Sequence, residues 1–300
     1  MKAKKATVGL VGAGRAATGL AVALRRRGFR IAGFVARRPS SARRAARAIG
    51  LRGGGAGDLA LLVRNASVLL ICVPDAEIPR VAAALSRLPP GGLLDKVVLH
   101  TSGAVGVAPL APLRDMGARV GGLHPLVSFS RVGVSPPGII EMRGIAFAIG
   151  GDPAAVRAAR ALVRALGGLP ILVAEEDRAA YHLAATLVAS GTAALLDVGI
   201  DIATRRLGLS RVRARAALTA LLASVVRNVA RDGAGKGLTG PVSRGDAGTV
   251  ARHLEALRKE DPSVRELYRL VSLRGVEMSL NDGRLDIAMA NDLRKRLDDD

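Results

Sequence analysis

The chain has few aromatic residues and almost no cysteine. Aromatic residues make up 2% of its 300 residues, and tryptophan is absent, so nucleic-acid bases have few rings on which to stack. The single cysteine, Cys72, excludes a disulfide framework and fits a reducing compartment. Its apolar setting in "SVLLICVP" indicates an inert core thiol. We therefore expect a cytoplasmic protein.

Long apolar runs are also scarce. The longest uncharged helical stretch, "LAATLVASGTAALL" at residues 183–196, is shorter than the roughly 20 residues that cross a bilayer. The apolar run behind the basic N-terminus is short and breaks into glycines, unlike a secretory signal. We expect neither a membrane segment nor a signal sequence.

Acidic residues are outnumbered, with 25 Asp and Glu against 45 Lys and Arg and a net charge of +20. Basic surfaces bind phosphate polymers, so nucleic acid is one alternative partner. That alternative predicts an affinity that falls steeply with salt. The arginines are spread along the whole chain, and we therefore expect no nucleic-acid partner despite the charge.

Apolar patterning divides the chain into two parts, as its length leads us to expect. Up to residue 174, near-continuous apolar runs alternate with helical segments, which indicates a parallel, doubly wound sheet covered on both faces. From residue 175 onward the patterns are helical only. We predict an α/β dinucleotide-binding domain at 1–174 and an all-α domain at 175–300. The predicted strands are 6–11, 30–36, 67–73, 96–100, 117–125, 144–151 and 169–174, and the later helices are 177–207, 210–231, 246–257, 262–279 and 285–297.

A glycine motif opens the chain, in "GLVGAGRAATG". Gly12 permits a tight turn, Gly14 lets a pyrophosphate approach the backbone, and the small Ala17 allows close packing of helix on strand. Arg15 and Ala16 complete the first helical turn, whose free amides attract phosphate. A structural glycine turn is the alternative, but the motif stands between a strand and a helix, which favours dinucleotide binding.

The end of the second predicted strand, "AGFVARRPSSARR", lacks the acid that usually binds the ribose of NAD. Arg37, Arg38 and Ser40 occupy its neighbourhood, with Ser40 or Ser41 as the expected helix cap. Arginine attracts the 2′-phosphate of NADP, which an aspartate would repel. Each charge-assisted contact contributes about 1.5–3 kcal/mol. We predict NADP(H), against the alternative that these arginines belong only to the general surface excess.

Further candidate residues follow later strands, where ligands bind in doubly wound sheets. Val73 and Pro74, in "CVPDAEIP", are predicted to lie beside the nicotinamide. Hydroxyls and loop amides at strand ends can anchor a substrate carboxylate. For Thr101 and Ser102, helix capping is an equal alternative. These candidates are Thr101, Ser102 and Gly103 in "LHTSGAVG", and His124 in "GLHPLVSFS".

Two more candidates lie in the helical part. His182, Thr186 and Ser190 are four residues apart and would form one polar line on a regular helix. A histidine such as His182 could donate a proton, because imidazole is the side chain that ordinarily changes its charge near neutral pH. A core histidine is the alternative. Arg244, in "LTGPVSRGD", could hold a carboxylate or phosphate with two hydrogen bonds. We expect no metal site.

Taken together, the motifs "GLVGAGRAATGLAVAL", "VPDAEI", "LHTSGA", "GLHPLVSF", "YHLAATLVAS" and "LTGPVSRGD" make the chain resemble the Rossmann-like/DUF2520 domain family. That family is related to 6-phosphogluconate dehydrogenase-like reductases, among them ketopantoate, pyrroline-5-carboxylate and F420-dependent NADP reductases. The resemblance implies a Rossmann domain followed by a 6-phosphogluconate dehydrogenase C-terminal-like helical domain that usually dimerises, with the active site between the domains. The dehydrogenase relatives carry a lysine and an asparagine on the long helix. Here "AATLVASG" has neither, which leaves His182 or His124 as the candidate acid.

Our leading prediction is an NADPH-dependent reductase of a small 2-oxo acid, with ketopantoate as first choice. His182 would donate the proton, His124 would orient the carbonyl, and Ser102 would hold the carboxylate. One alternative is an imine reductase of the pyrroline-5-carboxylate type, and another is a non-catalytic NADP-binding regulator. We also expect a homodimer, because the apolar helices exceed what one helical layer can cover.

Overall fold

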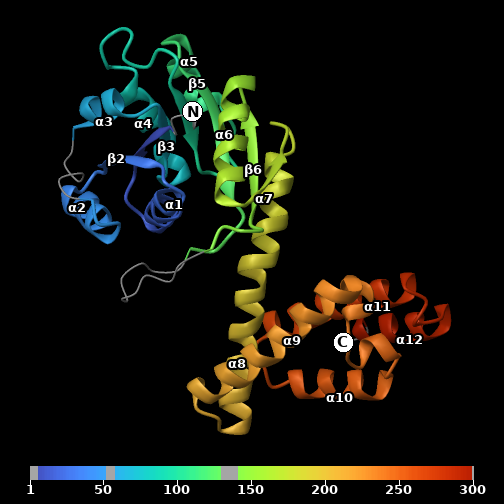
Figure 1. The fold of residues 1–300 in the computed structure, drawn as a ribbon. Coiled ribbons are helices and arrows are strands. Elements are labelled where there is room, and N and C mark those ends of the chain that lie inside the picture. The colour runs from blue at the N-terminus through green and yellow to red at the C-terminus, as the bar shows by residue number, and fades with distance from the viewer. Residues whose placement is uncertain (1–5, 52–57, 130–140, 299–300) are drawn as a thin grey trace. The chain divides into compact units, whose positions relative to one another are not determined.

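The computed structural model describes residues 6–51, 58–129 and 141–298 (Figure 1). The chain forms two compact units, Met1–Ala189 and Ser190–Asp300. The change from alternating strands and helices to helices alone comes earlier, after strand β7 (Leu169–Leu172). The predicted division at residue 174 marks that change of secondary structure.

The first unit is built on a seven-stranded sheet in the order β2-β1-β3-β4-β5-β6-β7. All seven predicted strands are present. Neighbouring strands are parallel except β5 and β6, so the prediction of a wholly parallel sheet is wrong at this pair. The described residues between β5 and β6 contain no helix, and a parallel connection needs such a crossover. The strands are β1 (Thr7–Val11), β2 (Arg30–Val35), β3 (Val68–Ile71), β4 (Val97–His100), β5 (Arg119–Pro125) and β6 (Ala146–Gly151).

Helices cover both faces of this sheet, because successive strand side chains point to opposite sides. Val68 and Leu70 of β3 belong to one buried core, and Leu69 and Ile71 belong to the other. The first core includes side chains of α1 (Arg15–Arg26), α2 (Pro39–Ala48) and α6 (Pro153–Leu166). The second includes side chains of α3 (Leu59–Asn65), α4 (Ile78–Leu85) and α5 (Ala111–Asp115).

The start of α2 corrects one prediction. Its N-cap is Arg38, with Pro39 in the first turn, and not Ser40 or Ser41. Proline is favoured at the first helical position because its φ is already helical and it has no amide hydrogen to satisfy. The helix therefore begins before the serines.

The predicted helix 177–207 is continuous but not regular. It consists of α7 (Arg178–Thr186), a π-helical turn η3 (Leu187–Gly191) and α8 (Thr192–Leu207). Gly208 ends α8 in the left-handed conformation, with φ 64°. Arg178–Leu207 is long and apolar enough to cross a membrane, with a mean hydropathy of 1.7 and only 6% of its apolar stretch buried. The sequence predicted no such segment, because the uncharged run ends before Asp197, whereas the helix continues past it.

The helical unit continues with α9 (Arg211–Gly237), α10 (Ala247–Leu257), α11 (Pro262–Asn281) and α12 (Ile287–Asp298). Asp246 and Asp261 cap α10 and α11 by accepting backbone N–H bonds, as predicted from the sequence. Side chains of α10, α11 and α12 form a buried core that includes Val250, Val276 and Leu293. α9 extends beyond its predicted end, across a non-helical Gly233 with φ 82°.

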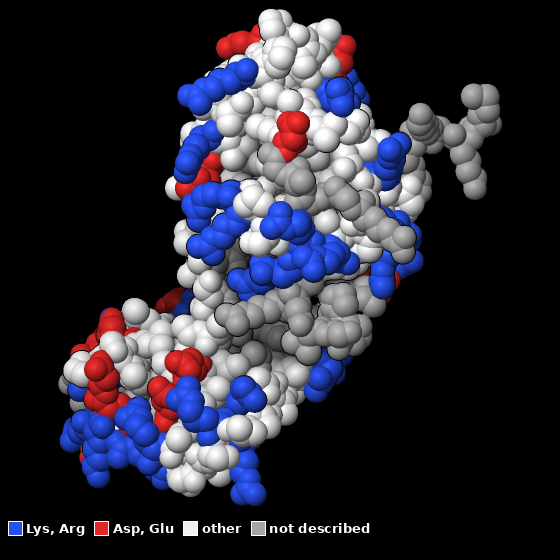
Figure 2. Space-filling model, turned by 90° about the vertical axis from the view of Figure 1, so that its left-hand side faces the viewer, with Lys and Arg blue, Asp and Glu red and all other residues white. Residues whose placement is uncertain are grey.

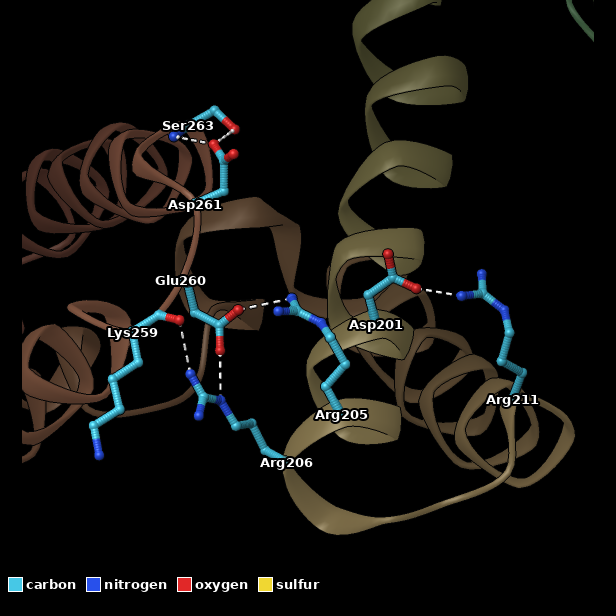
Figure 3. Close-up of polar contacts among 8 residues, drawn as sticks. All are labelled: Asp201, Arg205, Arg206, Arg211, Lys259, Glu260, Asp261 and Ser263. Carbon is cyan, nitrogen blue, oxygen red and sulfur yellow. Dashed lines mark hydrogen bonds and ion pairs between the residues drawn. The ribbon is translucent and has the colours of Figure 1, made fainter.

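An ionic cluster ties the end of α8 to the loop between α10 and α11 (Figure 3). Arg205 Nη2 and Arg206 Nε each lie 2.7 Å from the Glu260 carboxylate, whose side chain is only 3% exposed. Arg206 also donates to the Lys259 carbonyl oxygen at 2.9 Å. These hydrogen bonds lower the pKa of Glu260, so this carboxylate is ionised and paired in the folded unit.

Candidate active site

A cleft of about 770 Å³ opens at the carboxyl ends of β1, β2 and β3. β1 lies between β2 and β3, so successive connections leave it in opposite directions, and ligands of doubly wound sheets bind at this crevice. The volume suits a small-molecule cofactor. The lining includes Gly12, Gly14, Arg37, Arg38, Ser41, Arg44, Cys72, Val73, Pro74, Glu77 and Arg80.

The glycine turn forms the floor of this cleft. Gly12 has φ 106°, and a Cβ there would overlap the carbonyl oxygen of Cys72, so only glycine fits. A Cβ on Gly14 would meet nothing within 4 Å, which leaves that face of the backbone open. Gly14 is also the N-cap of α1, and no side chain caps the helix there. The fully buried Ala17 lets α1 pack closely on the sheet, whereas Arg15 and Ala16 contribute the rest of the first turn.

Arginines gather where β2 ends. Arg37, Arg38 and Arg44 line the cleft from β2 and α2, and Arg80 lines it from α4. Figure 2 shows basic side chains collected on the side of the sheet unit that carries α2. The sequence prediction omitted Arg44, although its spacing from Ser41 places both on one face of the helix.

Of the two serines in this region, Ser41 lines the cleft, and the predicted Ser40 is exposed near the start of α2. The acidic side chain that lines this cleft does not come from the end of β2. Glu77 follows β3, and its carboxylate lies 4.0 Å from Arg37 Nη1 and 3.5 Å from Arg80 Nη1. Cys72 also lines the cleft, and burial raises its pKa to about 12, so its thiol stays protonated.

A second polar group, which we call the polar cluster, is formed by residues at the ends of β4 and β5, in the loop after β4 and on α7. It consists of His100, Ser102, His124, Arg178, Tyr181 and His182. Ser102 is buried, and its Oγ accepts N–H bonds from Ala104 at 3.2 Å and Val105 at 2.9 Å. Thr101 Oγ1 donates to the carbonyl of Ile71 at 3.3 Å. Both hydroxyls therefore order the loop, and Ser102 caps a turn instead of a helix.

The histidines of the polar cluster meet at Gly103. A Cβ on this residue would lie 2.7 Å from His182 Cδ2 and 3.0 Å from His124 Cε1, so glycine lets both rings pack against the loop. Their centroids are 6.1 Å apart. The structure therefore brings together Gly103, His124 and His182, which the sequence analysis singled out from separate segments.

His124 Nδ1 also shares a 2.8 Å hydrogen bond with Tyr181 Oη. Burial, aided by His182 and Arg178, lowers the pKa of His124 to about 4, so this imidazole is neutral at neutral pH. Burial raises the pKa of Tyr181, and the positive charge of Arg178 opposes the rise. The sequence analysis assigned no role to Tyr181, although it directly precedes His182.

Arg178 was also missed, and it is only 1% exposed. A Cβ on Gly122 would overlap its Nη2, so glycine in the middle of β5 makes room for the guanidinium. Arg178 Nη1 donates to the Ser102 carbonyl at 3.4 Å, and its Nε lies 3.7 Å from Glu175. Burial, followed by the charge of Arg178, lowers the pKa of the neighbouring His100 to about 4.

The predicted polar line on the long helix is broken. His182 and Thr186 lie on α7, but Ser190 lies in the π-helical turn. A π turn bonds i to i+5, so residues spaced by four no longer share one line. Arg244 belongs to a short helix, η4 (Val242–Arg244), in the helical unit and is exposed. Its predicted role at the substrate stays a prediction.

Comparisons with known proteins confirm the resemblance drawn from the motifs. Residues 1–125 match a Rossmann-like domain, and residues 145–274 match the domain of unknown function DUF2520. The chain therefore carries a Rossmann-like match followed by a DUF2520 match, in the order that the motifs indicated. No curated protein matches it.

Solved structures share this fold over most of the chain. BF3122 from Bacteroides fragilis has a TM-score of 0.71 at 23% identity, covering 91% of this chain and 98% of its own. TM1727 from Thermotoga maritima has a TM-score of 0.70 at 25% identity, covering 92% and 100%. A pyrroline carboxylate reductase from Plasmodium falciparum, with NADP bound, has a TM-score of 0.57 at 14% identity, covering 96% and 99%.

Proposed function

We propose that this chain is an NADP(H)-dependent oxidoreductase that reduces a small carboxylate-bearing substrate. The observation that carries the proposal is the cleft: a glycine turn opens onto a helix N-terminus, and three arginines stand near the end of β2, where an NAD-binding chain would place an acid. A fourth, Arg80, lines the cleft from α4. The Plasmodium neighbour binds NADP on the same fold.

The residues of the cleft fit this cofactor. The amides of Gly14, Arg15 and Ala16 at the uncapped start of α1 would bind the pyrophosphate. Gly12, whose own amide donates to the Val35 carbonyl oxygen at 2.7 Å, would shape the turn beneath it. Arg37, Arg38 and Arg44 would bind the 2′-phosphate, assisted by the hydroxyls of Ser41 and Ser40. Val73 and Pro74, which follow β3, would flank the nicotinamide. The reduced cofactor would supply a hydride.

The polar cluster would hold the substrate. Our first choice is a 2-oxo acid such as ketopantoate. Its carboxylate would bind the loop amides at Ser102 and Gly103, where the buried charge of Arg178 favours an anion. Thr101, whose amide donates to the Ile71 carbonyl oxygen at 3.0 Å, would lie beside it. His124, Tyr181 and His182 would lie around the carbonyl oxygen of this substrate, which must receive a proton during reduction. Thr186, Ser190 and Arg244 remain proposed substrate contacts.

One observation favours an imine as the alternative substrate. His124 is neutral at neutral pH because burial lowers its pKa, and the chain lacks the catalytic lysine of the dehydrogenase relatives. A protonated imine already carries the proton that a carbonyl must receive. A cyclic imine of the pyrroline-5-carboxylate kind therefore needs less from these side chains.

A non-catalytic NADP-binding regulator is the alternative of another class, and the missing lysine and asparagine favour it. We propose to separate the classes by replacing His182 with Ala. A reductase would lose most of its turnover and still bind NADPH in an equilibrium titration. A regulator would show the same NADPH binding in both proteins and turnover in neither.

We also propose that a second copy of this chain covers α7, α8 and α9. Large apolar side chains on these helices and on the π-helical turn η3 between α7 and α8 are exposed, among them Leu187 at 65%, Val188 at 72% and Val212 at 66%. Exposed apolar surface of this extent marks an association site. The uncharged run, residues 183–196, is too short to span a bilayer, and Asp197 and Asp201, which pair with Arg211, follow on the same helix.

A further inference from the structure

One hydrogen bond of the polar cluster joins two elements that are distant in the sequence. His124 comes from the end of β5 and Tyr181 from the start of α7, and Nδ1 and Oη are 2.8 Å apart. The rings meet edge to face, with centroids 5.6 Å apart. We propose that Tyr181 is the proton donor of the reductase and that His124 returns a proton to it, which rests on the function proposed above.

The protonation states suit such a relay. Burial raises the pKa of Tyr181, so its phenol keeps the proton at neutral pH. His124 is neutral there, so one ring nitrogen carries a hydrogen and the other does not. A neutral imidazole can give the proton on Nδ1 to a phenolate while Nε2 accepts one from water. Tyr181 then ends the step as a phenol and His124 as its Nε2–H tautomer, which returns to the Nδ1–H form by exchanging protons with water.

Arg178 makes the loss of the phenol proton less costly. It precedes Tyr181 by three residues, so both lie on one face of α7. Its charge lowers the pKa of Tyr181 against the effect of burial, which means that it stabilises the phenolate. The other charged or titratable groups that act on His124 are His182 and Asp75. Arg178 is a positioning residue in this account.

The sheet places the pair within reach of the cofactor cleft. β3, which ends at the cleft, is followed across the sheet by β4 and β5, which end at the polar cluster. Neighbouring strands are about 4.8 Å apart. The end of β5 is therefore about 10 Å from the end of β3, on the same edge of the sheet.

The step balances as a carbonyl reduction. A hydride forms the new C–H bond at the carbonyl carbon, and NADPH becomes NADP⁺. The π electron pair moves to the carbonyl oxygen, which takes the proton from Tyr181 Oη. The phenolate takes the Nδ1 proton of His124, and one proton from water reaches Nε2. The product is the alcohol.

The chain contains a matched control for this pair. His253 and Tyr268, in the helical unit, share a 3.0 Å hydrogen bond with centroids 5.7 Å apart. There are only two tyrosines and no tryptophan, so ultraviolet titration of phenolate can follow each tyrosine alone. Tyr268→Phe leaves Tyr181 as the single signal, and Tyr181→Phe leaves Tyr268.

The test combines turnover with that titration. We expect Tyr181→Phe to lower turnover of the best 2-oxo acid about 10²–10⁴-fold, with NADPH binding unchanged, and Tyr268→Phe to keep full turnover. In the Tyr268→Phe background, we expect Arg178→Met to move the phenolate titration of Tyr181 to higher pH, whereas Arg47→Met, at an exposed position of α2, should leave it in place.

The outcomes separate this proposal from the function on which it rests. Full turnover in Tyr181→Phe, with loss in His182→Asn, overturns the relay and leaves the reductase standing. The relay is also overturned if Arg178→Met leaves the phenolate titration of Tyr181 at the same pH. NADPH binding without turnover of any compound by the unaltered chain overturns the relay and the reductase together.

Discussion

At the scale of single residues, the charge of Arg38 is proposed to act on the 2′-phosphate of NADP(H). This arginine lines the cleft where β2 ends, and a charge-assisted bond contributes about 1.5–3 kcal/mol. Arg38→Ala should weaken NADPH binding about tenfold or more and change NADH binding little, in equilibrium titrations of both. Arg47→Ala is the control, because Arg47 is exposed on the same helix and does not line the cleft. Equal losses for both nucleotides would contradict the 2′-phosphate site.

His100 predicts a pH dependence of stability. Its pKa is about 4 in the folded chain against an ordinary value of 6.5, chiefly because of burial. Above pH 6.5 both states are neutral, so the histidine contributes no pH dependence. Between pH 6.5 and 4 the unfolded chain takes up a proton that the folded chain excludes, so the free energy of unfolding falls as pH falls, by about 3 kcal/mol in total.

Denaturant unfolding at a series of pH values measures this slope. His100→Asn should make it shallower over the same window, whatever the variant's stability at neutral pH, and His124, whose pKa is also about 4, accounts for part of the slope that remains. Carboxylates titrate near the lower end of the window and are common to both proteins. Identical slopes in the two proteins would show that His100 is not excluded from protonation in the folded state.

At the scale of elements, the sequence predicted regular structure well. Apolar runs bounded by glycine and proline predicted all seven strands, because a sheet covered on both faces demands them. α3 and α5 were missed, since seven and five residues are too few for a helical period to show. The π turn was missed because the spacing of His182, Thr186 and Ser190 assumes a regular helix.

The site was predicted less completely than the fold. The glycine turn is local, so its residues could be found from their spacing. The bond between His124 and Tyr181 joins residues 57 positions apart, and no spacing rule connects them. The burial of Arg178 could not be predicted from its sequence neighbours, because the space for its guanidinium is left by Gly122 on β5.

The ionic cluster at Glu260 gives the prediction for elements. Glu260→Gln removes the carboxylate charge that pairs with Arg205 and Arg206. Both guanidinium groups then lose their counterion, and the side chain at position 260 is too buried for water to replace the lost ion pairs. We expect the melting temperature to fall by several degrees in thermal unfolding. Glu255→Gln should leave it unchanged, because that exposed pair with Arg258 is screened by water. Equal effects of the two changes would contradict the role given to the cluster.

At the scale of the whole molecule, the apolar helices predict a dimer. Light scattering should give twice the chain mass of 30.9 kDa. Leu187→Glu should shift the protein toward monomer, because it places a charge on the proposed interface. Leu94→Glu is the control, since Leu94 is similarly exposed, at 61% against 65%, but lies outside these helices. A monomer for the unaltered chain would contradict the proposal.

The central claim is that the chain uses NADPH to reduce a small carboxylate-bearing compound. Oxidation of NADPH by the purified protein, measured against 2-oxo acids and cyclic imines with NADH in parallel, tests it most directly. We predict turnover of one compound class, with NADPH preferred at least tenfold because of the arginines at the end of β2. Tight NADPH binding without turnover of any compound would contradict the claim and favour the regulator.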